Sequence, residues 1–238
     1  MLKTLWVAGA LALAMTSPAF AQDMSVDEIV VTGSRAREWD PEQLPHVQLV
    51  RRADNLIVSI RVVGDTRDAG LRRTEMVTTL RGIARAAAGR TDIDISLENE
   101  GVLVPLTEDM VSTLTMGVDG NRADTSVVSI IVKTPIGPND SLDSASGRIE
   151  SFVTGVPKSG RTLVSIWGDW QLTVINPNQY RAAILALMSA DATTTSTAFG
   201  PQYAVQVQGL QYPVTWRQSG PLELALFIPY SLTVTPRP

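Results

Sequence analysis

The chain contains no cysteine and a single histidine, His46, among its 238 residues. Without cysteine no disulfide can constrain the fold, so its stability has to come from a buried hydrophobic core. The hydrophobic content of 44% is ordinary for a globular protein and is enough to form such a core. Zinc and transition metals favour sulfur and nitrogen ligands, so the composition also argues against a site for these metals. We therefore predict a core-stabilised protein without a bound metal or cofactor.

Residues 1–21 have the pattern of a secretory signal peptide. Lys3 precedes an apolar run from Leu5 to Met15, and Ala19-Phe20-Ala21 matches the small-residue cleavage pattern. The run has 11 residues, whereas a helix needs roughly 20 to cross a bilayer core. We predict cleavage after Ala21 and export to the periplasm of a Gram-negative cell, with association with the outer membrane left open. No later segment has the hydropathy of a membrane helix, so we predict no transmembrane segment in the mature chain.

The charge of the mature chain argues against nucleic acid as a partner. Removal of Lys3 with the signal peptide leaves 19 basic and 24 acidic residues, a net charge of −5. Nucleic-acid binding needs a basic surface that neutralises phosphates, and this balance does not favour one.

Residues 22–52 differ in composition from the rest of the mature chain. They are polar, are interrupted by Pro41 and Pro45, and hold one short apolar patch at Ile29-Val30-Val31. So little apolar surface cannot offset the entropy lost on ordering the chain. We predict a flexible N-terminal tail over 22–52 and a folded domain over 53–238, beginning near Asp54.

The folded part mixes strand patterns with helix patterns, which predicts an α+β domain. Asp65 or Thr66 is the expected cap of the first helix, and Asn176-Pro177 is the expected start of the last. The predicted strands cover 55–63, 92–97, 125–133, 203–210 and 222–234, and the predicted helices cover 66–88, 142–153 and 177–199. A further extended segment over 162–175 is expected to turn as a hairpin at Gly168-Asp169.

The search for catalytic patterns leaves only carboxylates. Catalysis by serine, histidine and aspartate needs a histidine on a rigid element, and His46 lies in the predicted tail. Glu98 and Glu100 are two apart on a predicted strand and would share one face, as acid/base pairs do. One alternative is therefore an envelope hydrolase that uses these paired carboxylates on glycans, and the simpler interpretation is a solvated strand face.

Aromatic residues gather in the last third of the chain and provide a second alternative. Trp167, Trp170 and Trp216 could line an apolar pocket, since tryptophan supplies a large contact area with a polar group at its edge. This pattern is compatible with a periplasmic ligand-binding protein, and also with ordinary core packing.

The segment Asp27-Glu28-Ile29-Val30-Val31-Thr32-Gly33-Ser34-Arg35 resembles the TonB box of TonB-dependent outer-membrane receptors. The resemblance implies that residues Glu28, Ile29, Val30, Val31 and Thr32 bind the periplasmic protein TonB by adding a strand to its sheet. Such receptors form a 22-stranded barrel, but only 203 residues follow Arg35 and each barrel strand takes about ten residues before loops. The segment would therefore serve as a TonB contact without a receptor barrel.

The folded part resembles the SIMPL-domain family, also called DUF541. The resemblance rests on Ala53-Asp54-Asn55-Leu56-Ile57-Val58-Ser59-Ile60, the helix after Gly64-Asp65, Asp92-Ile93-Asp94-Ile95, Tyr180-Arg181-Ala182-Ala183-Ile184 and Phe199-Gly200-Pro201-Gln202-Tyr203. It implies an exported bacterial protein with an antiparallel sheet, packed helices and no catalytic residues, and some relatives form hollow oligomers. The sequence thus predicts a periplasmic, non-enzymatic scaffold or interaction module, a possible homo-oligomer, that recruits TonB through its tail.

Overall fold

The computed structural model describes residues 45–99, 102–120 and 122–237. The predicted signal peptide, the TonB-box-like segment and Glu100 lie outside these ranges. Within them, no helix combines the length and the apolar character that spanning a membrane requires.

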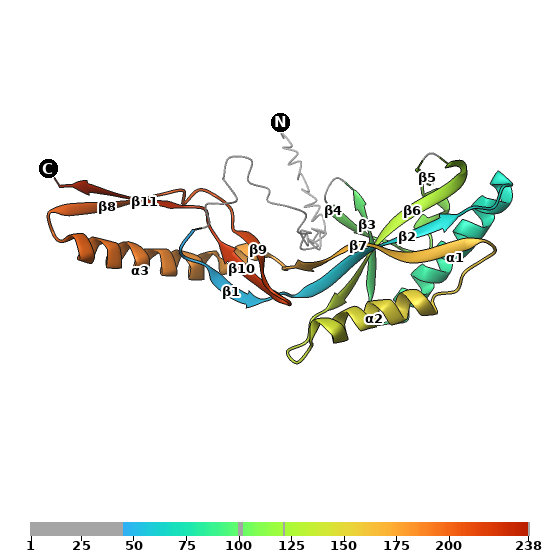
Figure 1. Cartoon of the computed structure of the whole chain (residues 1–238), viewed down its shortest axis with the longest axis horizontal. Helices are drawn as coiled ribbons and strands as arrows, with labels where there is room; N and C mark the ends of the chain where they lie inside the picture. Colours follow the sequence, from blue (N-terminus) through green and yellow to red (C-terminus); the bar gives the residue numbers. More distant parts are fainter. Residues whose placement is uncertain (1–44, 100–101, 121, 238) are drawn as a thin grey trace, which may run out of the picture.

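The larger part of the structure is a six-stranded antiparallel sheet with the main strand order β4-β3-β6-β2-β7, to which β5 is added by pairing with β6 (Figure 1). Its strands are β2 (Asn55–Gly64), β3 (Asp94–Asn99), β4 (Val102–Pro105), β5 (Gly117–Asp119), β6 (Arg122–Pro135) and β7 (Thr162–Thr173). A short 3-10 helix, η1 (Met110–Thr113), lies between β4 and β5. The predicted strands over 55–63 and 125–133 are confirmed as β2 and β6.

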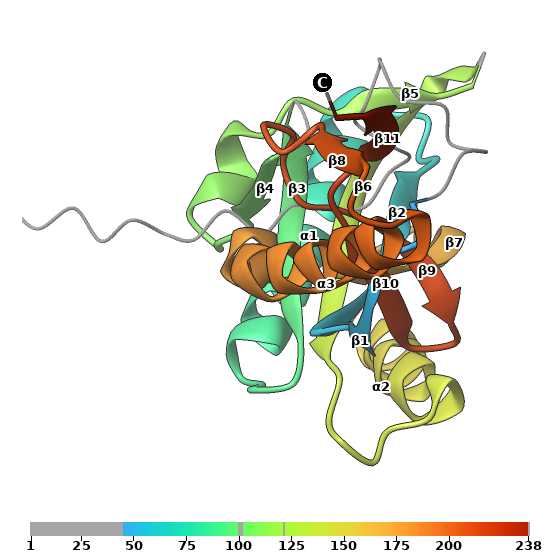
Figure 2. The same cartoon turned by 90° about the vertical axis from the view of Figure 1, so that its left-hand side faces the viewer.

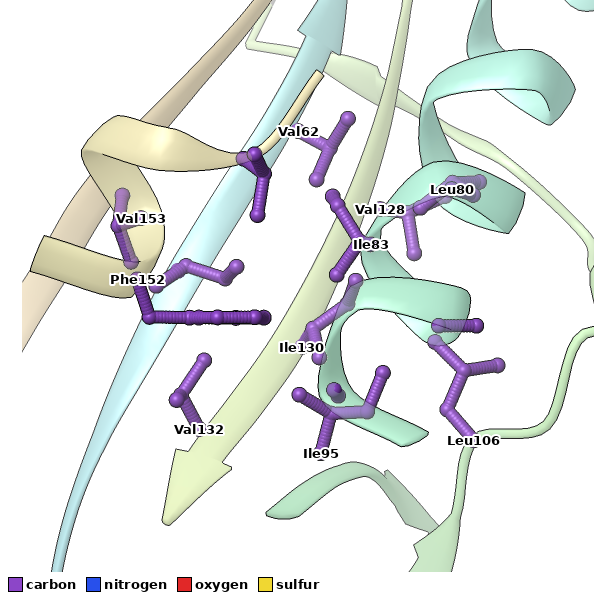
Figure 3. Packing of buried hydrophobic residues seen from close by; sticks show 14 of the residues in the cluster. Val62, Leu80, Ile83, Ile95, Leu106, Val128, Ile130, Val132, Phe152 and Val153 are labelled. Atoms are coloured by element: carbon purple, nitrogen blue, oxygen red, sulfur yellow. The ribbon is translucent and has the colours of Figure 1, made fainter. Parts of the chain in front are cut away.

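Two helices cover one face of this sheet and form the first core with it. Helix α1 (Ala69–Ala88) connects β2 to β3, and α2 (Leu142–Gly155) connects β6 to β7, which is the connectivity of a split β-α-β motif. Both helices match their predicted positions. Figure 3 shows their side chains converging on the same face of β2 and β6, where Leu80, Ile83, Phe152 and Val153 meet Val62, Val128, Ile130 and Val132. We refer to this sheet with α1 and α2 as the body.

A second core lies at one end of the body, where a three-stranded sheet is ordered β1-β10-β9. Its strands are β1 (Leu49–Arg52), β9 (Thr215–Gly220) and β10 (Glu223–Phe227), and all pairs are antiparallel. Leu56 of β2 and Leu172 of β7 belong to this core, so the long central strands connect both cores. Ile184 and Met188 cover it from the last helix.

The predicted tail over 22–52 is too long at its C-terminal end. Residues 49–52 form β1, which pairs along its whole length with β10, from Leu49 opposite Leu226 to Arg52 opposite Glu223. The physical reason is burial, because Val47 and Leu49 pack against the second core despite the preceding prolines. Residues 22–44 lie outside the described part of the chain.

The last helix and two strands form an extension that we call the arm. It consists of α3 (Arg181–Phe199), β8 (Tyr203–Gln208) and β11 (Ser231–Pro236), and the 3-10 helix η2 (Pro177–Tyr180) leads into it. Strands β8 and β11 pair with each other in antiparallel register. Figure 1 shows the arm reaching away from the body, with the C-terminus at its far end, and Figure 2 views it from that end.

The residues at which helices begin were predicted less accurately than the positions of the helices in the chain. Asp68 caps α1, its Oδ1 accepting a hydrogen bond from the Leu71 amide at 2.7 Å, so the expected caps Asp65 and Thr66 are wrong. Asp65 instead pairs with Arg161. Asn176 has left-handed backbone angles and its side chain makes no capping hydrogen bond, although Pro177 begins the helical turn as expected.

Two strand predictions also need correction. Strand β7 runs continuously through Gly168-Asp169, so this pair forms a bulge in the strand and not a hairpin turn. The segment 222–234 divides into β10 and β11, which belong to different sheets. Alternation of apolar residues cannot reveal such a division, because both strands have the same period.

Candidate functional site

The face of the main sheet opposite α1 and α2 carries a different set of side chains. Val58, Ile60 and Val62 of β2 point into the first core, and the alternate residues of the strand face the other side. On β7 the alternate residues Leu163 and Trp167 are 64% and 58% exposed. Large apolar side chains are therefore accessible on this open face.

Strand β7 contains a bulge next to Trp167, and Trp167 and Trp170, three residues apart in this strand, point to opposite faces of the sheet. Ile57 of β2 pairs with Gln171, and Ser59 pairs with Trp167, so three residues of β7 lie opposite one residue of β2. Gly168 takes a φ of +94° at this point, a conformation that side chains rarely tolerate. Trp167 remains on the open face, while Trp170 packs against both cores.

A small cavity of about 60 Å³ opens at this bulge. Ile57 and Ile131 are 1% and 7% exposed and form an apolar cluster with Leu103. The exposed residues Glu98, Trp167 and Asp169 lie at its margin. The cavity is lined by Ile57, Val58, Ser59, Glu98, Ile131, Trp167, Gly168, Asp169 and Gln171.

The cations near this cavity are already paired. Arg61 lies over the Trp167 ring, 4.4 Å from the ring centroid, and its Nη2 is 2.6 Å from the Asp119 carboxylate. Lys133, opposite Ile57 on β6, has its Nζ 3.5 Å from Asp94 Oδ2. Glu98 and Asp169 have no ion pair with any residue that the structure describes.

The three tryptophans proposed from the sequence do not share one pocket. Trp167 lines the cavity, whereas Trp170 and Trp216 pack against the second core. The indole N–H of Trp216 is buried without a hydrogen-bond acceptor among the described residues. The spacing of three residues places Trp167 and Trp170 on opposite faces of a continuous strand, and the sequence prediction missed this because it expected a hairpin turn between them.

Of the two carboxylates proposed as a catalytic pair, Glu98 and Glu100, the structure describes only Glu98. Glu98 lies at the cavity, and Glu100 lies outside the described residues. Asp92, on the same sequence segment, accepts hydrogen bonds from Arg90 at 2.7 and 2.9 Å, which lower the pKa of its carboxyl group. In the described ranges, no three acidic or histidine side chains gather closely enough to hold a metal ion.

The arm forms a second candidate site that the sequence prediction missed. Residues 182–216 contain one charged residue, Asp191, although 18% of the whole chain is charged. Helix α3 buries only Ile184 and Met188. The arm and the loop after β8 expose the large apolar residues Leu187, Phe199, Leu210 and Tyr212. The sequence already contained this information as a long segment with almost no charged residues. The structure shows that much of this segment lies on the surface.

Comparison with known proteins gives no relative for this chain. No protein-family model matches it, and neither a curated protein nor a solved structure is significantly similar to it.

Proposed function

We propose that the chain is an exported, non-enzymatic scaffold of SIMPL type that assembles with copies of itself through the arm and recruits TonB through Glu28–Thr32. The observation that carries the proposal is the exposed and nearly uncharged arm. Charged side chains are depleted at the centres of protein interfaces and enriched on ordinary surfaces. An exposed surface without them therefore has the composition of a contact surface.

The strands of the arm support the same proposal. Within the described part of the chain, β8 and β11 pair only with each other, so each has one unpaired edge. Neither strand contains a charged residue, and charges are the usual protection of an exposed edge against pairing. A two-stranded sheet is also marginally stable alone and gains from further packing.

A second copy of this chain is the partner that best fits the charges. The predicted mature chain has a net charge of −5, so two copies repel each other in general. In a two-fold contact the same patch is used by both copies, so an unbalanced charge close to the axis would face a like charge. The arm avoids this repulsion because its only charges between 182 and 216 come from Asp191.

The TonB part of the proposal rests on the tail sequence. Ile29, Val30 and Val31 are β-branched residues between polar ones, as strand addition requires. Strand β1 joins the chain to the second core at Leu49, so a partner held by the tail would be coupled to the folded domain.

Self-assembly can be tested with a matched pair of substitutions on two helices. Leu187 on α3 and Leu71 on α1 are 41% and 51% exposed. We expect residues 22–238 to elute as an oligomer, measured by size-exclusion chromatography with light scattering. Leu187→Glu should shift the mass toward the monomer, and Leu71→Glu should leave it unchanged. A monomeric parent protein, or an equal response of both variants, would contradict assembly through the arm.

TonB recruitment is tested by a pull-down with the C-terminal domain of TonB. Replacing Ile29 and Val31 with proline removes two backbone donors needed for strand pairing and should abolish capture. Proline at Gln22 and Met24 serves as the control and should leave capture intact. Equal capture of both variants would show that strand addition at Glu28–Thr32 does not occur.

A further inference from the structure

We propose that the cavity at the β7 bulge binds a primary ammonium or guanidinium group carried on a short apolar stem. The cavity and its lining are independent of the arm and of the tail, so this inference does not rest on the proposed assembly or on TonB.

The size of the cavity restricts the ligand to one side-chain-sized group. Pockets for drug-sized ligands have volumes of roughly 300–1,000 Å³. This cavity measures about 60 Å³, which is room for roughly four groups the size of water. A cationic head group with two or three methylenes has this size, whereas a whole nucleotide or a lipid does not.

The charge of the lining selects a cation. Glu98 and Asp169 both line the cavity, come from β3 and β7, and have no described ion-pair partner. Arg61, which lies over Trp167, and Lys133, which lies opposite Ile57, pair with Asp119 and Asp94. The cavity therefore has two carboxylates available for a cation from outside, each able to accept a charge-assisted hydrogen bond.

The remaining lining suits the stem and orients the head group. Ile57 and Ile131 offer apolar surface to methylenes. Trp167 is 58% exposed and attracts cations through its ring face, as its contact with Arg61 already shows. The side chains of Ser59 and Gln171 also line the cavity and add hydrogen-bonding oxygens beside the carboxylates.

The same chemistry could come from a free polyamine or from a lysine side chain of a peptide. Residues 22–238 would be titrated by calorimetry with n-butylamine, spermidine, an acetyl-capped trilysine peptide and the same peptide with acetylated lysines. n-Butanol serves as the neutral analogue of n-butylamine. Stronger binding of spermidine than of trilysine would identify a small polyamine as the ligand, and the reverse order would identify a basic peptide.

Charge-removing substitutions show whether the cavity is the binding site. Glu98→Gln and Asp169→Asn should each weaken amine binding about two- to fivefold, as expected for exposed ion pairs, and the double variant about tenfold. Glu150 on α2 is exposed and has no described partner, so Glu150→Gln is the matched control and should have no effect. Trp167→Leu should weaken binding about threefold through the lost ring contact.

Three outcomes would overturn the proposal. Amine binding that is as strong in the Glu98→Gln/Asp169→Asn double variant as in the parent protein places the site elsewhere. An equal loss in Glu150→Gln shows attraction to the overall negative charge only. Binding of n-butanol or of the acetylated peptide as strong as that of the cations shows that charge does not select the ligand. Circular dichroism of each variant would confirm that the fold is intact.

Discussion

Helices α1 and α3 have 20 and 19 residues, yet they are held in place in different ways. Helix α1 in the body buries seven residues, while α3 buries two. Helix α1 also has a side-chain cap at Asp68, and α3 has no side-chain cap. Since most helical stability in proteins comes from packing, the body stabilises itself and the arm does not to the same degree.

The second half of α3 is weakly stabilised by its own sequence. It contains Thr193, Thr194 and Thr197, whose hydroxyl groups donate hydrogen bonds to carbonyl oxygens four residues earlier. Threonine has a low helix propensity, and such bonds slightly weaken a helix. Helix α1 has hydroxyl bonds of the same kind at Thr74 and Thr78, but that helix also buries seven residues. Neither burial nor propensity explains why the second half of α3 stays helical, which is a reason to expect a partner surface against it.

The largest difference between the two regions should appear when a phenylalanine is removed from each. Phe152 of α2 is 4% exposed in the first core, and Phe199 of α3 is 51% exposed. Phe152→Ala should lower the free energy of unfolding by about 3–5 kcal/mol. Phe199→Ala loses only an edge contact with Tyr203 and should lower it by less than about 1 kcal/mol. Urea denaturation at low protein concentration measures both, and similar losses would show that the arm is as tightly packed as the body.

The next largest effect on the free energy of unfolding is expected at the ion pair between Asp140 and Arg148 in the body. Asp140 accepts two hydrogen bonds from Arg148 at 2.8 Å and others from the Gly137 amide and Ser144, which hold the pKa of Asp140 well below its usual range. Asp140→Asn should lower the free energy of unfolding by about 1.5–3 kcal/mol at neutral pH.

The pH dependence of this network has a definite sign. The folded-state pKa is depressed, so the stabilisation is present above the unfolded pKa of about 4 and is lost as pH falls below it. The difference between the parent protein and Asp140→Asn in urea denaturation should therefore shrink between pH 6 and roughly pH 3. A constant difference would show that the charge of Asp140 is not the stabilising factor.

Local patterns predicted the body well because its elements are amphipathic. In α2, Ile149, Phe152 and Val153 were expected to face inward, and all three are buried. The same logic failed at β1, because Val47 and Leu49 are too few to give a periodic signal. The strand is ordered by β10, far along the chain, where Leu226 lies opposite Leu49. Long-range pairing of this kind has no local signature in a single sequence.

The candidate site was predicted only in fragments. Trp167 and Glu98 were both singled out, but for different sites, since nothing in the sequence brings residue 98 next to residue 167. The strand order β3-β6-β2-β7 and the bulge opposite Val58 create that neighbourhood. Asp169 was interpreted as part of a turn, because Gly-Asp is a typical turn pair and a bulge uses the same residues.

Two glycines within helices of the body test how closely its elements pack. A Cβ on Gly82 of α1 would lie 2.8 Å from Pro157 Cγ, whereas a Cβ on Gly147 of α2 would meet no atom within 4 Å. Gly82→Ala should therefore lower the free energy of unfolding by about 1–2 kcal/mol through overpacking. Gly147→Ala should raise it by about 0.5–1 kcal/mol through helix propensity. Thermal unfolding measures both, and stabilisation by both would mean that α1 can move away from Pro157 without loss.

The smallest effect on the free energy of unfolding is expected at Asp191, the single charged residue between 182 and 216. The Tyr230 hydroxyl donates a hydrogen bond of 2.7 Å to Asp191 Oδ2, joining α3 to the segment before β11. Burial and the Asp191 carboxylate raise the pKa of Tyr230, so this stabilisation is present below the unfolded pKa of about 10 and is lost as pH rises through the folded one.

Asp191→Asn should lower the free energy of unfolding by about 0.5–1 kcal/mol at neutral pH and also lower the pKa of Tyr230. Ultraviolet titration of the phenol groups, with Tyr230→Phe to assign the signal, measures that pKa. An unchanged titration in Asp191→Asn would mean that the hydrogen bond between Tyr230 and Asp191 does not form in solution.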